Sequence, residues 1–379
     1  MESDFSWLLW GLPIAFVLGW LASRLDLRQL RIHNRQAQAP KAYFRGLNFL
    51  LNEQQDQAID AFIEAVRNDP DTSELHFALG NLFRRRGEYE RAVRVHEHLL
   101  ARGDLAKADR HRAQHALAMD YLKAGLLDRA EEALRKLEGT VHEGQALLAL
   151  LAIYERTRDW AQASDIARKL NDRGHGDFTG RLSHYLCEQA AQAPDEQAGE
   201  LVRQALATSP AAARPSLELA ALQRRASDHR AAFETLAQLA ATTPQAMGLI
   251  ARPLAESAIA SEQQARATQI LRASHDAAPS LDVLDALVLL EPDGEAARAL
   301  YVRHLEREPS LVAAAKWLAG EKLEHEDRHP LVQRALDHAT KPLTRYRCAA
   351  CGFEANRHFW QCPGCQAWDS YPARRAEEL

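Results

Sequence analysis

The sequence is poor in residues that favour β-strands. Val, Ile, Thr and Tyr are sparse along its 379 residues, whereas Ala, Leu, Glu, Arg and Gln dominate. Alanine and straight-chain residues are the strongest helix formers, so this composition argues against a sheet-based fold and predicts an all-α protein. Hydrophobic residues make up 46% and charged residues 26% of the chain, which is ordinary for a folded globular protein.

The chain also lacks the motifs of common catalytic sites. It contains no glycine-rich loop of the kind that cradles phosphate groups, and no recognisable arrangement of serine, histidine and aspartate for nucleophilic catalysis. Its formal net charge of −5 argues against non-specific nucleic-acid binding as the main task. These absences predict a protein that is not an enzyme and that has no nucleic-acid partner.

One catalytic motif matches the sequence, but its neighbouring residues do not favour the structure that the motif requires. The run His325-Glu326-Asp327-Arg328-His329 matches the His-Glu-x-x-His motif of zinc proteases. That motif needs one continuous helix, and Pro330 disfavours the helical conformation of the residue before it. We therefore expect an exposed turn between repeats here. A metalloprotease is the alternative, and replacing Glu326 by Gln distinguishes the two.

Cysteine is scarce, and four of the five cysteines form two Cys-x-x-Cys pairs near the C-terminal end. The pairs consist of Cys348, Cys351, Cys362 and Cys365. Two residues between cysteines let both thiolates of a pair reach one ion, and four thiolates close a tetrahedral site without a position for water. The spacing predicts one structural metal ion in a reducing compartment, with two disulfides or four free thiols as the alternative.

Glycines and aromatic residues accompany these cysteines. We expect Gly352 and Gly364 to supply the positive φ that each turn needs. We expect some of the rings to pack under the metal and others to dock on the last repeats. The rings are those of Tyr346, Phe353, Phe359, Trp360, Trp368 and Tyr371. The fifth cysteine, Cys187, stands in an apolar helical stretch and is interpreted as a buried core residue.

An uncharged apolar run at residues 5–22 is long enough to span a bilayer core. Acidic residues precede it, and four arginines follow it at Arg24, Arg28, Arg31 and Arg35. The positive-inside rule then places the N-terminus on the outer side of the membrane and the bulk of the chain in the cytoplasm. A cleaved signal peptide is the alternative. Such a peptide begins with basic residues and ends at a small-residue cleavage site, and neither feature is convincing in this run.

The small residues Gly11, Ala15 and Gly19 recur every four positions within this run, and such a stripe permits close packing of two helices. They predict a possible homo-oligomer formed through the span. The spacing of the four arginines puts them on one face of a juxtamembrane helix, against anionic head groups.

A 34-residue period runs through the middle of the chain, as between Gly46 and Gly80. Ala58 and Ala92 occupy the matching position in the second half of each unit. These are the positions of a tetratricopeptide repeat, in which the glycine lies where two antiparallel helices touch. The pattern decays after Gln245, so we expect eight to nine helix pairs, stacked into a right-handed superhelix that offers an extended surface to peptides.

The combination of features resembles a known family. An N-terminal span, a basic helix, tetratricopeptide units and the motif Tyr-x-Cys-x-x-Cys-Gly-Phe…Trp-x-Cys-Pro-x-Cys-x-x-Trp, from Tyr346 to Trp368, resemble the lipopolysaccharide assembly protein B family of Gram-negative bacteria. The resemblance covers Phe5 to Trp368 and implies a rubredoxin-type or zinc-ribbon domain whose ligands are the four paired cysteines. It also implies iron as the ion, whereas the spacing itself suits iron and zinc equally.

The resemblance further implies a function. Members of the family act at the cytoplasmic face of the inner membrane as adaptors of the membrane protease FtsH, and they promote degradation of LpxC, the deacetylase of lipid A synthesis. For this chain it implies a non-catalytic, single-pass adaptor that regulates lipopolysaccharide synthesis, with other inner-membrane proteins of that process as further partners. A scaffold that gathers the synthetic enzymes without controlling proteolysis is the alternative.

The predicted organisation has five parts. They are a transmembrane anchor at 1–23, a basic juxtamembrane helix at 24–41, a tetratricopeptide-repeat array at 42–341, a four-cysteine metal-binding domain at 342–372 and a tail at 373–379. Three arginines near the cysteines leave a nucleic-acid-binding zinc ribbon as another alternative, although no wider basic face accompanies them.

Overall fold

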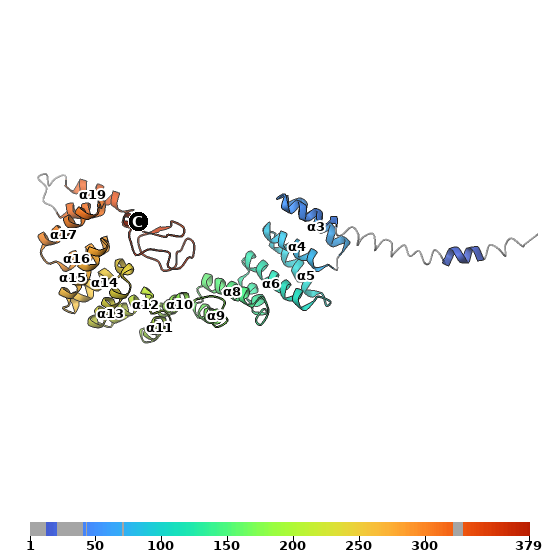
Figure 1. Ribbon diagram of the computed structural model, residues 1–379, viewed down its shortest axis with the longest axis horizontal. Coiled ribbons are helices and arrows are strands. Elements are labelled where there is room, and N and C mark those ends of the chain that lie inside the picture. Colours follow the sequence, from blue (N-terminus) through green and yellow to red (C-terminus); the bar gives the residue numbers. More distant parts are fainter. Residues whose placement is uncertain (1–12, 21–40, 43, 70–71, 321–328) are drawn as a thin grey trace, which may run out of the picture. The chain divides into compact units, whose positions relative to one another are not determined.

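The computed structural model describes residues 13–20, 41–42, 44–69, 72–320 and 329–379 (Figure 1). Residues 13–20 are helical, and the rest of the predicted span at 5–22 lies outside the described residues. Nearly all of the predicted basic helix at 24–41 lies outside them too. Within the described ranges, no helix combines the length and the hydropathy that crossing a bilayer requires.

Helices make up most of the described chain, as its composition predicts. Residues 44–51 are helical, and the named helices follow in order. They are α3 Gln55–Asn68, α4 Ser73–Arg85, α5 Tyr89–Ala101, α6 Lys107–Ala124, α7 Leu127–Arg135, α8 Glu143–Thr157, α9 Trp160–Asp172, α10 Thr179–Gln192, α11 Asp195–Thr208, α12 Ala213–Arg225, α13 His229–Thr242, η1 Pro244–Ala246, α14 Met247–Ala260, α15 Gln264–Ala277, α16 Leu281–Leu290, α17 Gly294–Arg307, α18 Leu311–Ala319 and α19 His329–Thr340.

Most helices that follow one another in the chain pack against each other, as α4 does with α5 and α10 with α11. The sixteen helices α4 to α19 make eight pairs, and residues 44–51 with α3 make a ninth among the described residues. This is the upper of the two numbers predicted. The apolar stretches after Gln245, where the repeat pattern decays, also fold into helix pairs.

The glycines of the repeat pattern lie where the two helices of a pair touch. A Cβ atom on Gly46 would lie 2.9 Å from the ring of Phe62, and one on Gly80 would lie 2.5 Å from the ring of His96. Real Cβ atoms do not approach other atoms so closely, so only glycine lets these helices pack at this distance. The packing confirms the interpretation of the 34-residue period.

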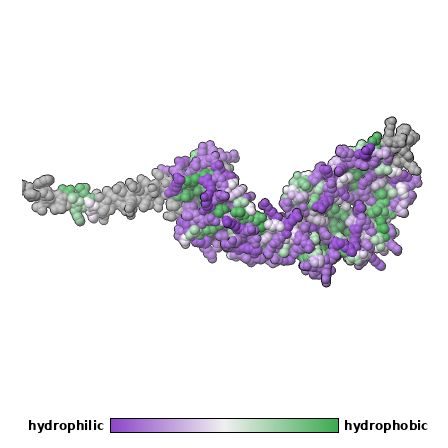
Figure 2. All heavy atoms as spheres, turned by 180° about the vertical axis from the view of Figure 1, so that it is seen from behind, coloured by the Kyte–Doolittle hydropathy of each residue, from purple (hydrophilic) through white to green (hydrophobic). Residues whose placement is uncertain are grey.

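The chain divides into two compact units, residues 1–153 and 154–379. In the first unit, a hydrophobic core runs from the helix at 44–51 through α3 and α4 to α5. In the second unit, a larger core runs from α12 to α18. On the face shown in Figure 2, hydrophilic residues predominate and hydrophobic residues are scattered among them.

The second unit ends in a small domain with little regular structure. Strand β1, Tyr346–Arg347, pairs antiparallel with β2, Glu354–Ala355, and a single bridge joins Gln361 to Trp368. A short 3-10 helix η3, Ala376–Glu378, lies near the C-terminus. In Figure 1 this domain lies near α10, α12 and α14, and the contacts below show how it is held there.

Candidate metal centre

The two Cys-x-x-Cys pairs form two turns with the same hydrogen bonds. The amide of Cys348 donates to the carbonyl of Phe353 at 2.9 Å, and the amide of Cys362 donates to the carbonyl of Ala367 at 2.9 Å. In each turn the amide four residues after the first cysteine donates back to the carbonyl of that cysteine. Each turn therefore presents its two sulfur atoms in the same way.

The structure brings the four sulfur atoms together. All four lie within 4.8 Å of one another, with Cys348 and Cys365 at 3.9 Å and Cys351 and Cys362 at 3.7 Å. A tetrahedral ion with bonds of about 2.3 Å to sulfur sets its ligands about 3.8 Å apart. A disulfide would need about 2.0 Å. The residues therefore fit one tetrahedral ion, and the alternative of two disulfides does not fit.

Each turn contains one residue with positive φ, and in one of the two turns this residue is not the expected glycine. Gly352 has φ of 77°, as expected, but the second turn has its left-handed residue at Gln366, with φ of 62°, and not at Gly364. Both left-handed residues follow the second cysteine of their turn. Gly364 matters for close approach instead, because a Cβ there would lie 3.4 Å from Phe353 and 3.5 Å from Sγ of Cys351.

The surroundings of the sulfur atoms lower the pKa of one cysteine thiol and raise the pKa of another. Burial raises the pKa of the Cys348 thiol, but the hydroxyl of Ser370 and two backbone amides outweigh burial and lower this pKa to about 6. The backbone at Phe353 lowers the pKa of Cys351, but burial and the other three cysteines raise it to about 12. Four thiolates in this space repel one another, and a bound cation would remove that repulsion.

Aromatic rings pack beneath the sulfur cluster, as expected for some of them. Tyr346 and Tyr371 are buried together with Cys348 and Cys362, and Phe359 packs against this group. The hydroxyl of Tyr371 donates to the carbonyl of Phe353 at 3.1 Å, and burial together with the neighbouring Cys362 raises the pKa of this tyrosine. These contacts give the small domain a core of its own beside the candidate ion.

Other rings dock on the array, but not only on its last repeats. The indole nitrogen of Trp368 donates to Glu155 of α8 at 2.9 Å, and the Trp368 ring stacks on His184 of α10 at 4.8 Å. Nε2 of His184 also lies 2.9 Å from the carboxylate of Asp369. The expectation of docking on the last repeats is therefore incomplete, because Trp368 lies at the start of the second unit.

The C-terminal residues reach the last repeats instead. Arg375 makes two hydrogen bonds to the carboxylate of Asp282 in α16, at 2.9 and 2.7 Å. Glu377 accepts the amide of Leu311 at 2.6 Å, at the start of α18, and Glu378 accepts the amide of Leu281, at the start of α16. The residues predicted only as a tail thus cap two helices.

A close backbone contact fixes the path of this segment. A Cβ atom on Gly248 of α14 would lie 2.1 Å from the carbonyl oxygen of Ala373. Only glycine at position 248 therefore allows the C-terminal segment to pass over α14. Sequence reasoning missed this glycine and the segment, because neither belongs to the repeat pattern or to the metal motif.

The other predicted residues lie apart from this site. Cys187 is 1% exposed in α10, and burial raises its pKa to about 12, as expected for a core residue. His325 to Arg328 lie outside the described residues. His329 begins α19, and its Nε2 donates to the carbonyl of Leu318 at 3.1 Å.

The chain is similar to several known proteins. Residues 346–371 match the family model described as rubredoxin metal binding domain. Lipopolysaccharide assembly protein B of Escherichia coli strain K12 is 31% identical over 95% of both chains, and that of Haemophilus influenzae is 29% identical over 95% of this chain and 96% of the other. Among solved structures, Naa15/Naa10 bound to HypK-THB aligns with 81% of this chain and 48% of that one, at 15% identity and a TM-score of 0.48.

Fold and site together define the class: an all-helical protein of stacked helix pairs that carries a rubredoxin-type four-cysteine domain on its own repeats. The extent and identity of the match to the curated relatives show the family within this class. The chain belongs to the lipopolysaccharide assembly protein B family.

Proposed function

We propose that this protein is a non-catalytic, membrane-anchored adaptor that regulates lipopolysaccharide synthesis. The observation that carries the proposal is the match to lipopolysaccharide assembly protein B over 95% of both chains, which includes the array and the metal domain alike. The finer mechanism follows the family resemblance: the protein brings the deacetylase LpxC to the membrane protease FtsH and so promotes its degradation. An adaptor of this kind needs surfaces for two partners and no chemistry of its own.

The metal ion in this proposal is structural. Cys348, Cys351, Cys362 and Cys365 would hold one iron or zinc ion in a closed tetrahedral site. The ion would supply the cohesion that keeps the two turns and their aromatic neighbours folded. Through Trp368 and Asp369, the same domain holds α8 and α10, so the ion would stabilise part of the array as well.

Membrane attachment is also part of the proposal. Residues 5–22 would span the inner membrane with the N-terminus in the periplasm. The described part of this run supports the idea, because residues 13–20 are helical and Ile14, Phe16 and Leu18 are 57%, 76% and 63% exposed. A tether raises the local concentration of a client beside a membrane-embedded protease, so modest affinities suffice.

The experiment is complementation of a bacterium depleted of its own lipopolysaccharide assembly protein B. LpxC half-life is measured after synthesis is blocked, with this chain, with the chain lacking residues 1–23, or with an empty vector. The proposal expects a short half-life only with the complete chain. A half-life that stays long with the complete chain, although the chain is present at the membrane, would contradict the proposal.

A further inference from the structure

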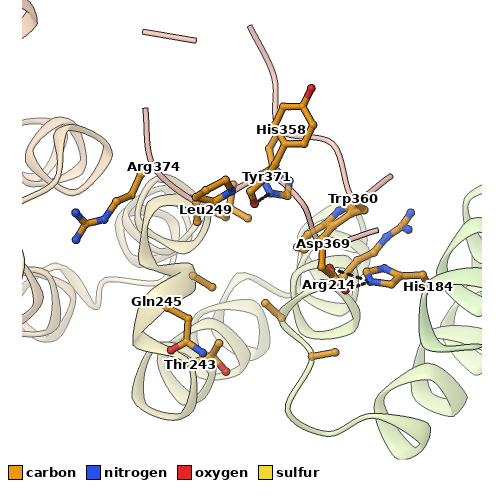
Figure 3. Close-up of a pocket in the computed structure, with 15 residues that line it drawn as sticks. His184, Arg214, Thr243, Gln245, Leu249, His358, Trp360, Asp369, Tyr371 and Arg374 are labelled. Atoms are coloured by element: carbon orange, nitrogen blue, oxygen red, sulfur yellow. Dashed lines mark hydrogen bonds and ion pairs between the residues drawn. The ribbon is translucent and has the colours of Figure 1, made fainter. Parts of the chain in front are cut away.

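A cavity of about 520 Å³ lies between the four-cysteine domain and the helix pairs of the second unit (Figure 3). One wall comes from α10, the start of α12 and the start of α14, and the other comes from His358, Trp360 and residues 369–374. Its volume is in the range of small-molecule sites, which are mostly concave and carry a few polar groups. The family's metal site does not account for this cavity.

Two arginines and one aspartate line the cavity. Arg214 and Arg374 appear on opposite sides in Figure 3, with Thr243 and Gln245 below them. Arg374 is exposed and makes no ion pair with any residue that the structure describes. Among the described residues of the wall, Asp369 has the single carboxylate, and Nε2 of His184 lies 2.9 Å from it. An anion entering the cavity therefore meets the guanidinium of Arg374, which has no ion-pair partner among these residues, and a carboxylate that is already hydrogen-bonded to His184.

Arg214 is the most unusual residue of the wall. It is 5% exposed, and its Nε and Nη1 groups have no hydrogen-bond partner. Its Nη2 donates to Glu188 at 2.8 Å, and Glu218 lies 3.6 Å from Nε. Two carboxylates thus lie against the guanidinium, but two of its buried nitrogen atoms still lack a hydrogen-bond acceptor. Leaving buried donors unpaired costs free energy, and a ligand oxygen is the kind of acceptor that would relieve it.

The start of α12 adds a further preference for anions. This helix of 13 residues begins at Ala213, and its N-cap, Ala212, offers no side-chain acceptor. Both alanines line the cavity. The first amides of a helix point outward with the positive end of the helix dipole, and anions bind there. The apolar residues of the wall include Leu249, and the ring of Tyr371 lies near it.

We propose that this cavity binds a small organic oxyanion, either a carboxylate or a phosphate monoester. Arg214 and the start of α12 contact the charged group, the apolar part of the ligand packs on Leu249 and Tyr371, and Arg374 adds a positive charge on the opposite side of the cavity. The ring of Trp360, whose centre lies 5.9 Å from the guanidinium carbon of Arg214, covers the unpaired N–H groups and moves aside when the ligand binds. Because both walls contribute, the ligand stabilises the docked position of the four-cysteine domain.

The test is calorimetric titration of the full-length protein in detergent micelles, at constant ionic strength and with a micelle blank. The probes are phenyl phosphate, benzoate and the neutral benzyl alcohol. The proposal expects saturable one-to-one binding of at least one anion, with a Kd of about 1 mM or tighter for probes of this size. Which of the two anions binds then distinguishes phosphate esters from carboxylates. Lack of saturation by both, or equal binding of benzyl alcohol, overturns the proposal.

Two variants and one control complete the test. Arg214→Lys is expected to weaken binding about tenfold, the effect of one charge-assisted hydrogen bond, and Arg374→Gln about threefold, because the ligand loses one nearby positive charge. Arg374 is exposed, so its variant keeps the test valid even if Arg214→Lys disturbs folding. Arg357→Gln, which changes an exposed arginine of the same domain that does not line the cavity, is expected to bind like the unchanged protein. Equal binding by Arg374→Gln overturns the proposal, and the result does not depend on the proposed adaptor function.

Discussion

Four sulfur atoms at tetrahedral separations are the main chemical feature of this chain at the residue scale. Cys348 and Cys362 are buried, whereas Cys351 and Cys365 are exposed. Each turn thus contributes one buried and one exposed cysteine to the candidate metal site. A site built in this way has no position for a substrate, and loss of one sulfur leaves the other three without a closed shell.

Replacing Cys362 by Ser is expected to abolish stoichiometric metal binding and to unfold the four-cysteine domain, because structural tetrathiolate sites supply much of the folding free energy of such small domains. Metal content by mass spectrometry and the emission of Trp360 and Trp368 would report both effects. Cys187→Ala is the control: the protein should keep its metal and lose only about 1–2 kcal/mol of unfolding free energy. Full metal content in Cys362→Ser would refute the assignment of this ligand.

At the scale of elements, the C-terminal segment joins helices that the repeat pattern treats as separate. Glu377 and Glu378 each accept an amide at the start of a different helix, α18 and α16. The N-cap of α16, Ser280, makes no side-chain cap of its own, so Glu378 supplies the acceptor that this helix lacks. The cap of α16 therefore depends on a residue 97 positions away in the sequence. In α18, Glu377 lies 66 positions from Leu311 and adds to the cap that Ser310 already makes.

Replacing Gly248 by Ala is expected to displace this segment, since the new Cβ would lie 2.1 Å from the carbonyl oxygen of Ala373. Strain of this kind destabilises by about 1–3 kcal/mol. Hydrogen exchange at the amides of Leu281 and Leu311 would rise as their glutamate acceptors leave. Gly199→Ala in α11 is the matched control, because its Cβ meets only the end of the Arg203 side chain, at 3.6 Å. Unchanged exchange at both amides in Gly248→Ala would show that the segment tolerates a side chain there.

Two histidines link α15 to α17 in the same region. Nε2 of His275 lies 3.1 Å from Nδ1 of His304, and burial lowers the pKa of both below the ordinary value near 6.5. For His275 the nearby His304 and Arg307 lower it further, while for His304 the carboxylates of Glu378, Glu308 and Glu377 act in the opposite direction. The folded state therefore prefers both rings uncharged.

This preference sets the direction of a pH effect. The unfolded chain binds more protons than the folded chain once the pH falls below about 6.5, so the contribution of the pair is complete above that pH and is lost below it. The free energy of unfolding of the second unit, measured in urea, should fall as the pH is lowered from 7.5 to 5.5. His304→Gln should flatten this slope, whereas changing the exposed His175 to Gln should not. An equal slope in His304→Gln would assign the effect to other groups.

At the scale of the whole molecule, stability is distributed unevenly along the array. Each helix pair contacts mainly its neighbours, so unfolding propagates locally in such proteins. The second unit has an additional connection, because the four-cysteine domain and the C-terminal segment contact α8, α10, α14, α16 and α18. Removal of the ion should therefore destabilise the second unit before it destabilises the first.

Removing the metal with a chelator is expected to speed hydrogen exchange in α10, α14 and α16, because these helices lose the contacts of the small domain. Exchange in α4 and α6 of the first unit should stay as it was. The comparison uses full-length protein with and without metal, followed by mass spectrometry of peptides from both units. Equal acceleration in α4 and in α10 would mean that the ion does not act through the contacts described here.

The sequence by itself determined the elements and the sulfur cluster. Helix pairs follow from composition and from a 34-residue spacing, and the site follows from two short turns, because both depend on residues close together in the chain. Even so, local reasoning placed the second left-handed residue at Gly364, whereas the geometry of the turn puts it after the second cysteine, at Gln366.

Only the tertiary structure decided where the four-cysteine domain docks and what lies between it and the helices. His184 and Asp369 are 185 residues apart in the chain, and no spacing rule connects them. The cavity beside Arg214 and the close passage at Gly248 likewise exist only because distant segments meet. Periodicity records contacts between neighbours, whereas docking depends on the shapes and charges of surfaces that form after the helices have stacked.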